Sequence, residues 1–140
     1  MASLSSLVAR VRTPYVVRTR IYVAGPISLG DPVANCQRAI QVGFELMDRG
    51  YAPFVPHYSY FVDMDSTAGK GRYEQWIGID FSYIAVCHAL LRLPGVSKGA
   101  DREVAWAHQM GIPVFFDSQD LYGLMSPFMR VMHGPHREES

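Results

Sequence analysis

The sequence is poor in cysteine, in net charge and in long apolar runs, and each shortage excludes a class of protein. Only Cys36 and Cys87 are present and they form no Cys-x-x-Cys motif, which argues against a disulfide framework and for a reducing compartment, so we expect a cytoplasmic protein. The 13 basic and 13 acidic residues cancel, so the broad positive field of a nucleic-acid-binding protein is missing. No segment approaches the roughly 20 apolar residues of a membrane span. These absences favour a soluble protein with a small-molecule partner, no nucleic acid and no membrane.

Motifs that indicate a metal or a cofactor are also absent. The histidines form neither a His-Glu-x-x-His motif nor a Cys/His pairing at zinc spacing. The glycine-rich signatures of dinucleotide sites and P-loops do not occur. No serine or cysteine stands in a recognisable motif with a histidine. The sequence therefore predicts no metal, no cofactor and no hydrolytic triad.

The length of 140 residues, 49% of them hydrophobic, suits one domain with a substantial core. Residues 1–30 hold arginines but no acidic side chain, a composition found in organellar transit peptides and also in irregular N-terminal ends. The second interpretation is favoured because the segment runs directly into a strand. We expect a flexible extension over residues 1–18, an α/β domain over residues 19–132 and a C-terminal tail over residues 133–140.

Apolar patterning predicts alternating strands and helices. The β-branched and aromatic run at 20–24 indicates a first strand, and Asp31 followed by Pro32 indicates a helix that ends at Gly50. The expected apolar stripe of this helix consists of Val33, Cys36, Ile40, Phe44 and Met47. A short edge strand is predicted over residues 51–56 and a loop over residues 57–65. An amphipathic helix is expected over residues 72–87. Two further strands, at 89–93 and 112–116, are expected on either side of another helix. This order implies a single-domain, three-layer α/β sandwich with a mostly parallel, Rossmann- or flavodoxin-like sheet.

Two carboxylates stand beside apolar helix faces. Glu103 lies on the edge of the face formed by Ala100 and Ala107. This position is expected to lie in the first turn of a helix, where the helix dipole stabilises the ionised form of a carboxyl group, and an ionised carboxylate suits a nucleophile. The alternative is an ordinary glutamate that only interacts favourably with the helix dipole. Asp80 borders the apolar face of the preceding helix, where a carboxylate must be paired or face a wet pocket. It is therefore a candidate site residue or the partner of a nearby arginine.

Two loops that follow parallel strands are expected to share the ligand-binding rim of the sheet. They span residues 25–30 and 94–99, and their small residues have backbone N–H groups that can bind an anion. Ser28 and Ser97 add hydroxyl groups, although loop serines more often satisfy their own turns. His57, which follows Pro56 at a strand end, is placed to reach the pocket rim.

Three parts of the sequence resemble the nucleoside 2-deoxyribosyltransferase-like superfamily: Tyr22-Val-Ala-Gly-Pro-Ile-Ser28, Asp80, and Leu93-Pro-Gly-x-Ser-Lys-Gly-Ala-x-x-Glu103 followed by Gly-Ile-Pro-Val. The resemblance covers about residues 19–117 and is nearest to the nucleotide N-hydrolase branch and to a bacterial and phage branch. It implies cleavage of an N-glycosidic bond with Glu103 as the nucleophile. It also implies that Asp80 holds a sugar hydroxyl or assists the leaving base and that Tyr22 lies near the nucleophile.

The resemblance also implies where the substrate binds. Ser97 stands where the N-hydrolase branch has a phosphate-binding serine and the transferases have an aspartate, which favours a nucleoside 5'-monophosphate over a nucleoside. Two features depart from the relatives: His88 stands where they often have Asp, and residues 26–29 replace a phosphate loop rich in glycine and arginine. The expected substrate-binding residues are Gly25, Pro26, Ile27, Ser28, His57, Ser97 and Gly99.

Three functions remain open from the sequence. The first is a nucleotide N-glycosidase that uses the two-step logic of retaining glycosidases, the second a base-exchanging deoxyribosyltransferase, and the third a non-catalytic nucleotide-binding module. A homodimer or higher homo-oligomer is also expected, because relatives form dimers and because apolar side chains such as Tyr58, Tyr60, Phe61 and the methionines after Leu121 need cover.

Overall fold

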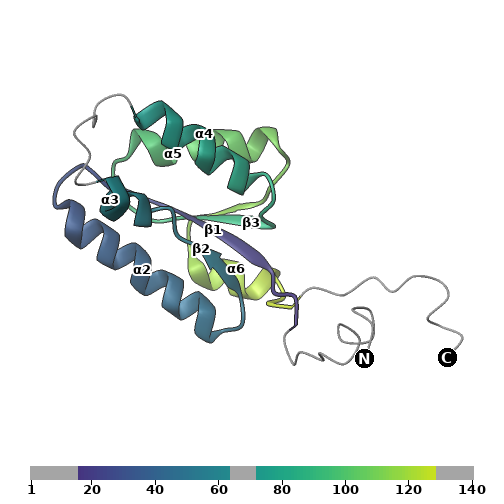
Figure 1. Ribbon diagram of the computed structural model, residues 1–140. Helices are drawn as coiled ribbons and strands as arrows, with labels where there is room; N and C mark the ends of the chain where they lie inside the picture. Colours follow the sequence, from purple (N-terminus) through teal and green to yellow (C-terminus); the bar gives the residue numbers. More distant parts are fainter. Residues whose placement is uncertain (1–15, 64–71, 129–140) are drawn as a thin grey trace, which may run out of the picture.

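The computed structural model describes residues 16–63 and 72–128, in which a sheet of four parallel strands lies between two layers of helices (Figure 1). The strand order is β2-β1-β3-β4. The expected α/β sandwich with a parallel sheet is confirmed. Residues 1–15 of the predicted extension and the whole predicted tail lie outside the described residues, and the domain boundaries stay predictions. No helix within the two described segments has the length and hydrophobicity needed to cross a membrane.

The strands are β1 (Arg20–Ala24), β2 (Ala52–Phe54), β3 (Ala89–Arg92) and β4 (Val114–Phe115). The helices are α2 (Pro32–Asp48), α3 (Tyr58–Asp63), α4 (Tyr73–Ile84), α5 (Lys98–Gln109) and α6 (Ser118–Leu124). As its prolines predicted, β2 is an edge strand, and it pairs with β1 in the register Arg20 to Ala52. Asp31 caps α2 as expected, because its Oδ1 accepts hydrogen bonds from the Val33 and Ala34 backbone N–H groups.

Residues 57–65 were expected to form a loop, and that expectation was wrong because α3 occupies most of them. The helix begins with turns in which the Ser59 N–H donates to the Pro56 carbonyl at 3.0 Å and the Tyr60 N–H to the His57 carbonyl at 3.1 Å. Its aromatic side chains also have partners: the Tyr58 ring meets the Trp76 indole edge-on at 6.3 Å. Tertiary packing thus supports a helix too short for the sequence to predict.

The face that α2 turns toward the sheet also differs from the expected one. The buried positions are Cys36, Ala39, Gly43 and Leu46, whereas Val33, Phe44 and Met47 of the predicted stripe are exposed. A Cβ atom on Gly43 would lie only 2.8 Å from Val55 Cγ2, so the helix approaches β2 more closely than a larger residue allows. Small residues at three of the four buried positions therefore select the packed face, and Val33, Phe44 and Met47 are left outside.

Each face of the sheet has its own core. On one face, α2 and α6 cover a cluster without charged side chains: Ile21, Val23, Ala39, Leu46, Tyr51, Ala89, Leu91, Leu93 and Leu121. On the other face, α4 and α5 cover a second cluster: Tyr22, Ala24, Ile84, Cys87, Leu90, Ala100 and Ala107. Buried beside this second cluster are three charged residues, Asp80, Arg92 and Glu103. The second face is therefore where function has to be sought.

Candidate active site

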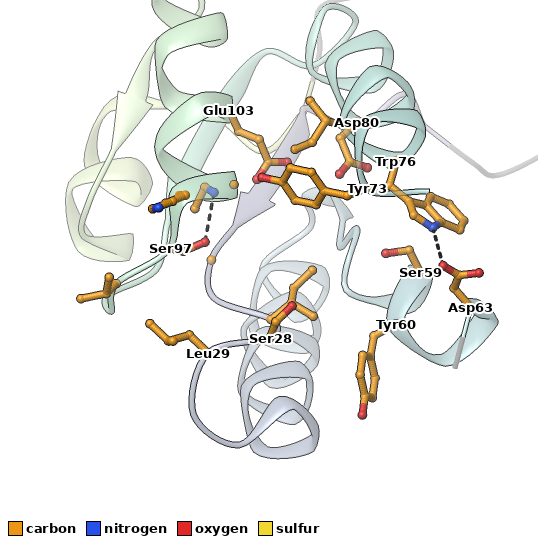
Figure 2. A pocket seen from close by; sticks show the side chains of 17 residues that line it. Ser28, Leu29, Ser59, Tyr60, Asp63, Tyr73, Trp76, Asp80, Ser97 and Glu103 are labelled. Carbon is orange, nitrogen blue, oxygen red and sulfur yellow. Dashed lines mark hydrogen bonds between the residues drawn. The ribbon is translucent and has the colours of Figure 1, made fainter. Parts of the chain in front are cut away.

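A cavity of about 740 Å³ opens where the loops after β1 and β3 meet α3, α4 and α5 (Figure 2). Both loops line it, which confirms the expectation that they share one rim; they contribute Gly25, Ile27, Ser28, Leu29, Val96 and Ser97, and Lys98 and Gly99 follow at the start of α5. The helices contribute Ser59, Tyr60, Asp63, Tyr73, Trp76, Ile77, Asp80, Ala100 and Glu103. Small-molecule sites typically measure roughly 300 to 1,000 Å³, so the cavity has the size for a nucleotide.

Three titratable side chains from distant parts of the chain meet beside this cavity. Tyr22 on β1 is fully buried, and its hydroxyl donates a hydrogen bond to Glu103 Oε2 on α5. Asp80 on α4 lies close enough to both for its charge to affect them. Asp80 and Glu103 line the cavity, while the Tyr22 ring stacks on Phe54 at 5.7 Å between centroids. The fold thus joins the three residues that the sequence named as catalytic candidates.

The two carboxyl groups have strongly perturbed acidities. Burial raises the pKa of Glu103 to about 8 and that of Asp80 to about 7. The hydrogen bond that the Tyr22 hydroxyl donates to Glu103 opposes the rise at Glu103, and the proximity of the same hydroxyl opposes it at Asp80. The negative charge of Asp80 raises the pKa of Glu103 further, since two like charges in a poorly solvated site repel each other. The pair therefore retains a proton near neutral pH, which allows one carboxyl to act as an acid while the other is ionised.

Tyr22 stays protonated in this arrangement. Burial, followed by the charges of Glu103 and Asp80, raises the pKa of its phenol above the ordinary value of 10.0. A phenol that keeps its proton can donate to a carboxylate throughout the physiological range. Tyr22 is thus a neutral donor aimed at Glu103.

Glu103 does not occupy the first turn of its helix, contrary to the sequence-based expectation. Ser97 is the N-cap and α5 begins at Lys98, so the first-turn acid is Asp101. The helix-dipole effect falls off within the first turn, and one of the free N–H groups, that of Ala100, donates to Ser97 Oγ at 3.1 Å. The expected stabilisation of the Glu103 anion by the dipole was therefore wrong, and burial raises the pKa instead.

Arg92 is a charged neighbour of the site that sequence reasoning missed. Its side chain is 9% exposed, its Nη2 lies 3.0 Å from Asp101 Oδ1, and its Nη1 donates to the Leu93 carbonyl. The positive charge of Arg92 lowers the pKa of Glu103, so it offsets part of the effect of burial. An arginine inside the otherwise apolar run at 89–93 was the available signal, because a buried guanidinium needs a partner.

The predicted substrate-binding residues do not all reach the cavity. Gly25, Ile27, Ser28, Ser97 and Gly99 line it. At Gly99 a Cβ atom would lie 3.4 Å from the Tyr73 hydroxyl oxygen, so glycine leaves room between α4 and α5. Pro26 and His57 are not among the lining residues.

His57 is buried beneath the first loop rather than at the rim. It is 1% exposed, and burial lowers its pKa to about 4, an effect that the neighbouring Pro26 and Gly25 backbone groups oppose only in part. The ring is therefore neutral at physiological pH. In this position His57 is next to the loop that lines the cavity, but has no direct access to a ligand there.

Further lining residues come from α3 and α4 and were not among the predicted site residues. Tyr73, Trp76 and Asp80 recur at intervals of three and four, so they share one face of α4. This spacing was a usable signal once Asp80 had been singled out. Trp76 Nε1 donates to Asp63 Oδ2 at 3.2 Å, which ties the face to the end of α3. Across the described segments, no group of three or more His, Cys, Asp or Glu side chains is arranged to hold a metal ion.

The fold is that of the 2-deoxyribosyltransferases. The 2-deoxyribosyltransferase of the psychrotolerant bacterium Bacillus psychrosaccharolyticus superposes with a TM-score of 0.54 at 18% identity, over 81% of this chain and 100% of that one. The 2-deoxyribosyltransferase of Leishmania mexicana gives 0.49 at 19% identity, over 80% of this chain and 79% of that one. At such identities the likeness concerns the fold alone. No curated protein matches the chain.

A family model matches residues 19–117, which hold β1 to β4 and the helices between them. The chain belongs to this family, described as a domain of unknown function, DUF7768.

Proposed function

We propose that this protein cleaves the N-glycosidic bond of a nucleoside 5'-monophosphate and releases the free base and the sugar phosphate. The observation that carries the proposal is the position of Glu103. This carboxyl is 5% exposed, lines a nucleotide-sized cavity, accepts a hydrogen bond from Tyr22 and interacts with a second carboxyl, Asp80. Two carboxyl groups with different roles are the requirement of two-step glycosyl transfer.

In the proposed reaction, the Glu103 carboxylate attacks C1' of the sugar as the C1'–N bond breaks. The bond electrons leave with the base, which takes a proton from Asp80. Tyr22 orients the attacking carboxylate through its hydrogen bond. Water then attacks C1' of the glycosyl ester and gives a proton to Asp80, which restores both carboxyl groups. The reaction uses the form of the pair in which Asp80 holds the shared proton and Glu103 is ionised. Because the pKa of Glu103, about 8, lies above that of Asp80, about 7, this reactive form is the minor one near neutral pH.

The phosphate is assigned to the end of the cavity near the start of α5. Ser97 and Lys98 lie there, and Ser28 comes from the neighbouring loop. Lys98 adds a positive charge that sequence reasoning did not consider. The Ser97 oxygen already accepts from the Ala100 N–H, but its hydroxyl hydrogen is free to donate to an anion. A 5'-phosphate in this position meets hydroxyl groups, a lysine and a helix N-terminus together.

A panel of nucleotides assayed for released base tests the reaction. Glu103→Gln is expected to reduce base release by about 1,000-fold or more, because the amide is nearly isosteric but is a poor nucleophile. Nucleotide binding by the same variant, measured by calorimetry, should persist. Base release at a wild-type rate by Glu103→Gln contradicts the role of Glu103.

The form of the substrate is tested by comparing each 5'-monophosphate with its nucleoside. Two charge-assisted hydrogen bonds predict a preference for the monophosphate of about tenfold or more in kcat/KM, and Ser97→Ala should narrow it. Because Ser97 also caps α5, the matched control is Asp117→Ala, which removes the cap of α6 on the other face of the sheet. The phosphate assignment fails if both substrates react alike, or if the preference is unchanged in Ser97→Ala.

A second candidate is base exchange, which the shared fold with 2-deoxyribosyltransferases supports. The same glycosyl ester would then be attacked by another base instead of water. Adding a second free base and looking for a new nucleotide or nucleoside separates the two reactions. If the protein binds nucleotides but turns them over in neither assay, its function is that of a non-catalytic nucleotide-binding module.

A further inference from the structure

The cavity has two chemically different ends on either side of Glu103. Figure 2 shows Ser97 and Leu29 on one side of Glu103 and Asp80, and Trp76 and Asp63 on the other. If C1' of the substrate is at Glu103 and the phosphate is at Ser97, the base extends toward Trp76 and Asp63. This assignment rests on the proposed function, and it makes the second end the place where one base is distinguished from another.

The carboxylate of Asp63 is held in a defined orientation at that end. Asp63 is the last residue of α3, and its side chain is 19% exposed and lines the cavity. Its Oδ2 accepts from Trp76 Nε1 at 3.2 Å, and its Oδ1 lies 3.5 Å from Arg72 Nε. An ionised carboxylate has about four acceptor positions, so these two neighbours, the ones it has among residues 16–63 and 72–128, leave lone pairs for a ligand. Asp63 therefore offers oriented acceptors, with no donor, to whatever fills this end.

We propose that Asp63 selects nucleotides whose base carries an exocyclic amino group over those with a carbonyl oxygen in the same position. An amino group donates to the carboxylate, whereas a carbonyl oxygen would bring two acceptors together with no hydrogen between them. Ser59 and Tyr60 also line the cavity, but their hydroxyl groups both donate and accept, so they do not discriminate. A site built to bind an N–H rejects the analogue that lacks it, because its own polar group is left unpaired.

The test uses pairs of nucleotides that exchange the exocyclic amino group for a carbonyl oxygen and, with it, gain a hydrogen on the adjacent ring nitrogen: cytidine and uridine 5'-monophosphate, and adenosine and inosine 5'-monophosphate. Binding is measured by calorimetry on the full chain carrying Glu103→Gln, so that turnover does not interfere, and kcat/KM is measured with Glu103 intact. The amino member of at least one pair should be preferred by about tenfold or more. Asp63→Asn keeps an oxygen for the Trp76 N–H and gains an amide donor, so it should remove or reverse that preference.

Asp48→Asn is the matched control, since Asp48 is the last residue of α2 as Asp63 is of α3, and it does not line the cavity. It should leave the preference unchanged. Trp76→Phe provides a second variant, which keeps an aromatic ring but removes the N–H that orients Asp63; it should weaken the preference without reversing it. This second variant keeps the inference testable even if Asp63→Asn does not fold.

Two results overturn the inference in distinguishable ways. If nucleotides bind but Asp63→Asn and Trp76→Phe prefer amino-bearing bases as strongly as the parent protein does, the proposal that Asp63 selects the base is wrong and the proposed function stands. If the parent protein favours the carbonyl member of both pairs, selection by Asp63 is likewise wrong and the proposed function stands. If a folded protein neither binds nor cleaves any nucleotide of the panel, the proposed function itself fails.

Discussion

The two faces of the sheet differ in what they bury. Under α2 and α6 the buried residues of the core are apolar or aromatic, and none is charged. Under α4 and α5 the core borders Asp80, Arg92 and Glu103, all of them less than 10% exposed. Both layers pack against the same strands, because successive side chains of a strand point to opposite faces: Ile21 and Val23 go to the first core, Tyr22 and Ala24 to the second.

This difference separates stability from chemistry. Burying an apolar side chain stabilises the fold, whereas burying a carboxylate costs free energy that appears as a raised pKa. The raised pKa values of Glu103 and Asp80 show that the second face carries that cost. The first face must supply the stability that offsets it, and the two faces should therefore respond in opposite ways to mutation.

The largest effect is expected on the apolar face. Leu46 of α2 is fully buried in the first core, so Leu46→Ala should lower the free energy of unfolding by about 2 to 5 kcal/mol. Urea denaturation measures the change. The loss should be equal near pH 5 and pH 8, because no titratable group is removed; a loss that depends strongly on pH contradicts the separation of the two faces.

An opposite effect is expected at Glu103. Its pKa is about 8 in the folded protein against an ordinary 4.5, so its protonated form favours folding; that contribution is complete below about pH 4.5 and is lost as the pH rises toward 8. Glu103→Gln cannot ionise. It should be more stable than the wild type at pH 8 by about 1 to 3 kcal/mol, and the difference should shrink toward pH 5.

Thermal unfolding at several pH values measures this difference. The matched control is Glu74→Gln, the same change on an exposed residue whose pKa is lowered by its hydrogen bond to Arg102. It should bring no gain in stability at pH 8. A Glu103→Gln variant that is no more stable than the wild type at that pH contradicts the burial of an anion at this position.

The smallest effect is expected at Tyr22. Tyr22→Phe keeps the ring that stacks on Phe54 but removes the donor to Glu103, so the pKa of Glu103 should rise further, by about one unit. Carbon-13 NMR titration of labelled glutamate measures the shift without reference to activity. The acidic limb of the kcat/KM profile should move to higher pH by a similar amount. An unchanged titration would show that the hydrogen bond does not favour the ionised form.

Much of the fold followed from local patterns in the sequence. The run at 20–24, the Asp31-Pro32 helix start and the prolines of residues 51–56 are local signals, and each correctly predicted an element. The prediction of the inner face of α2 was wrong because periodicity identifies large apolar residues, whereas the close contact of Gly43 with Val55 requires small ones. The short helix α3 was missed because packing of its aromatic residues stabilises it.

The candidate site divides in a similar way. The sequence by itself determined the alternation of strands and helices, the two loops at one rim, and the choice of Tyr22, Asp80 and Glu103 as candidates, since each depends on spacing along the chain. The tertiary structure decided that these three side chains meet and that Arg92 lies near Glu103. It also decided that Asp63 and Trp76 line the same cavity and that His57 does not. Burial and the distances between charges set the acidity of Glu103, and neither exists until β1, α4 and α5 pack together.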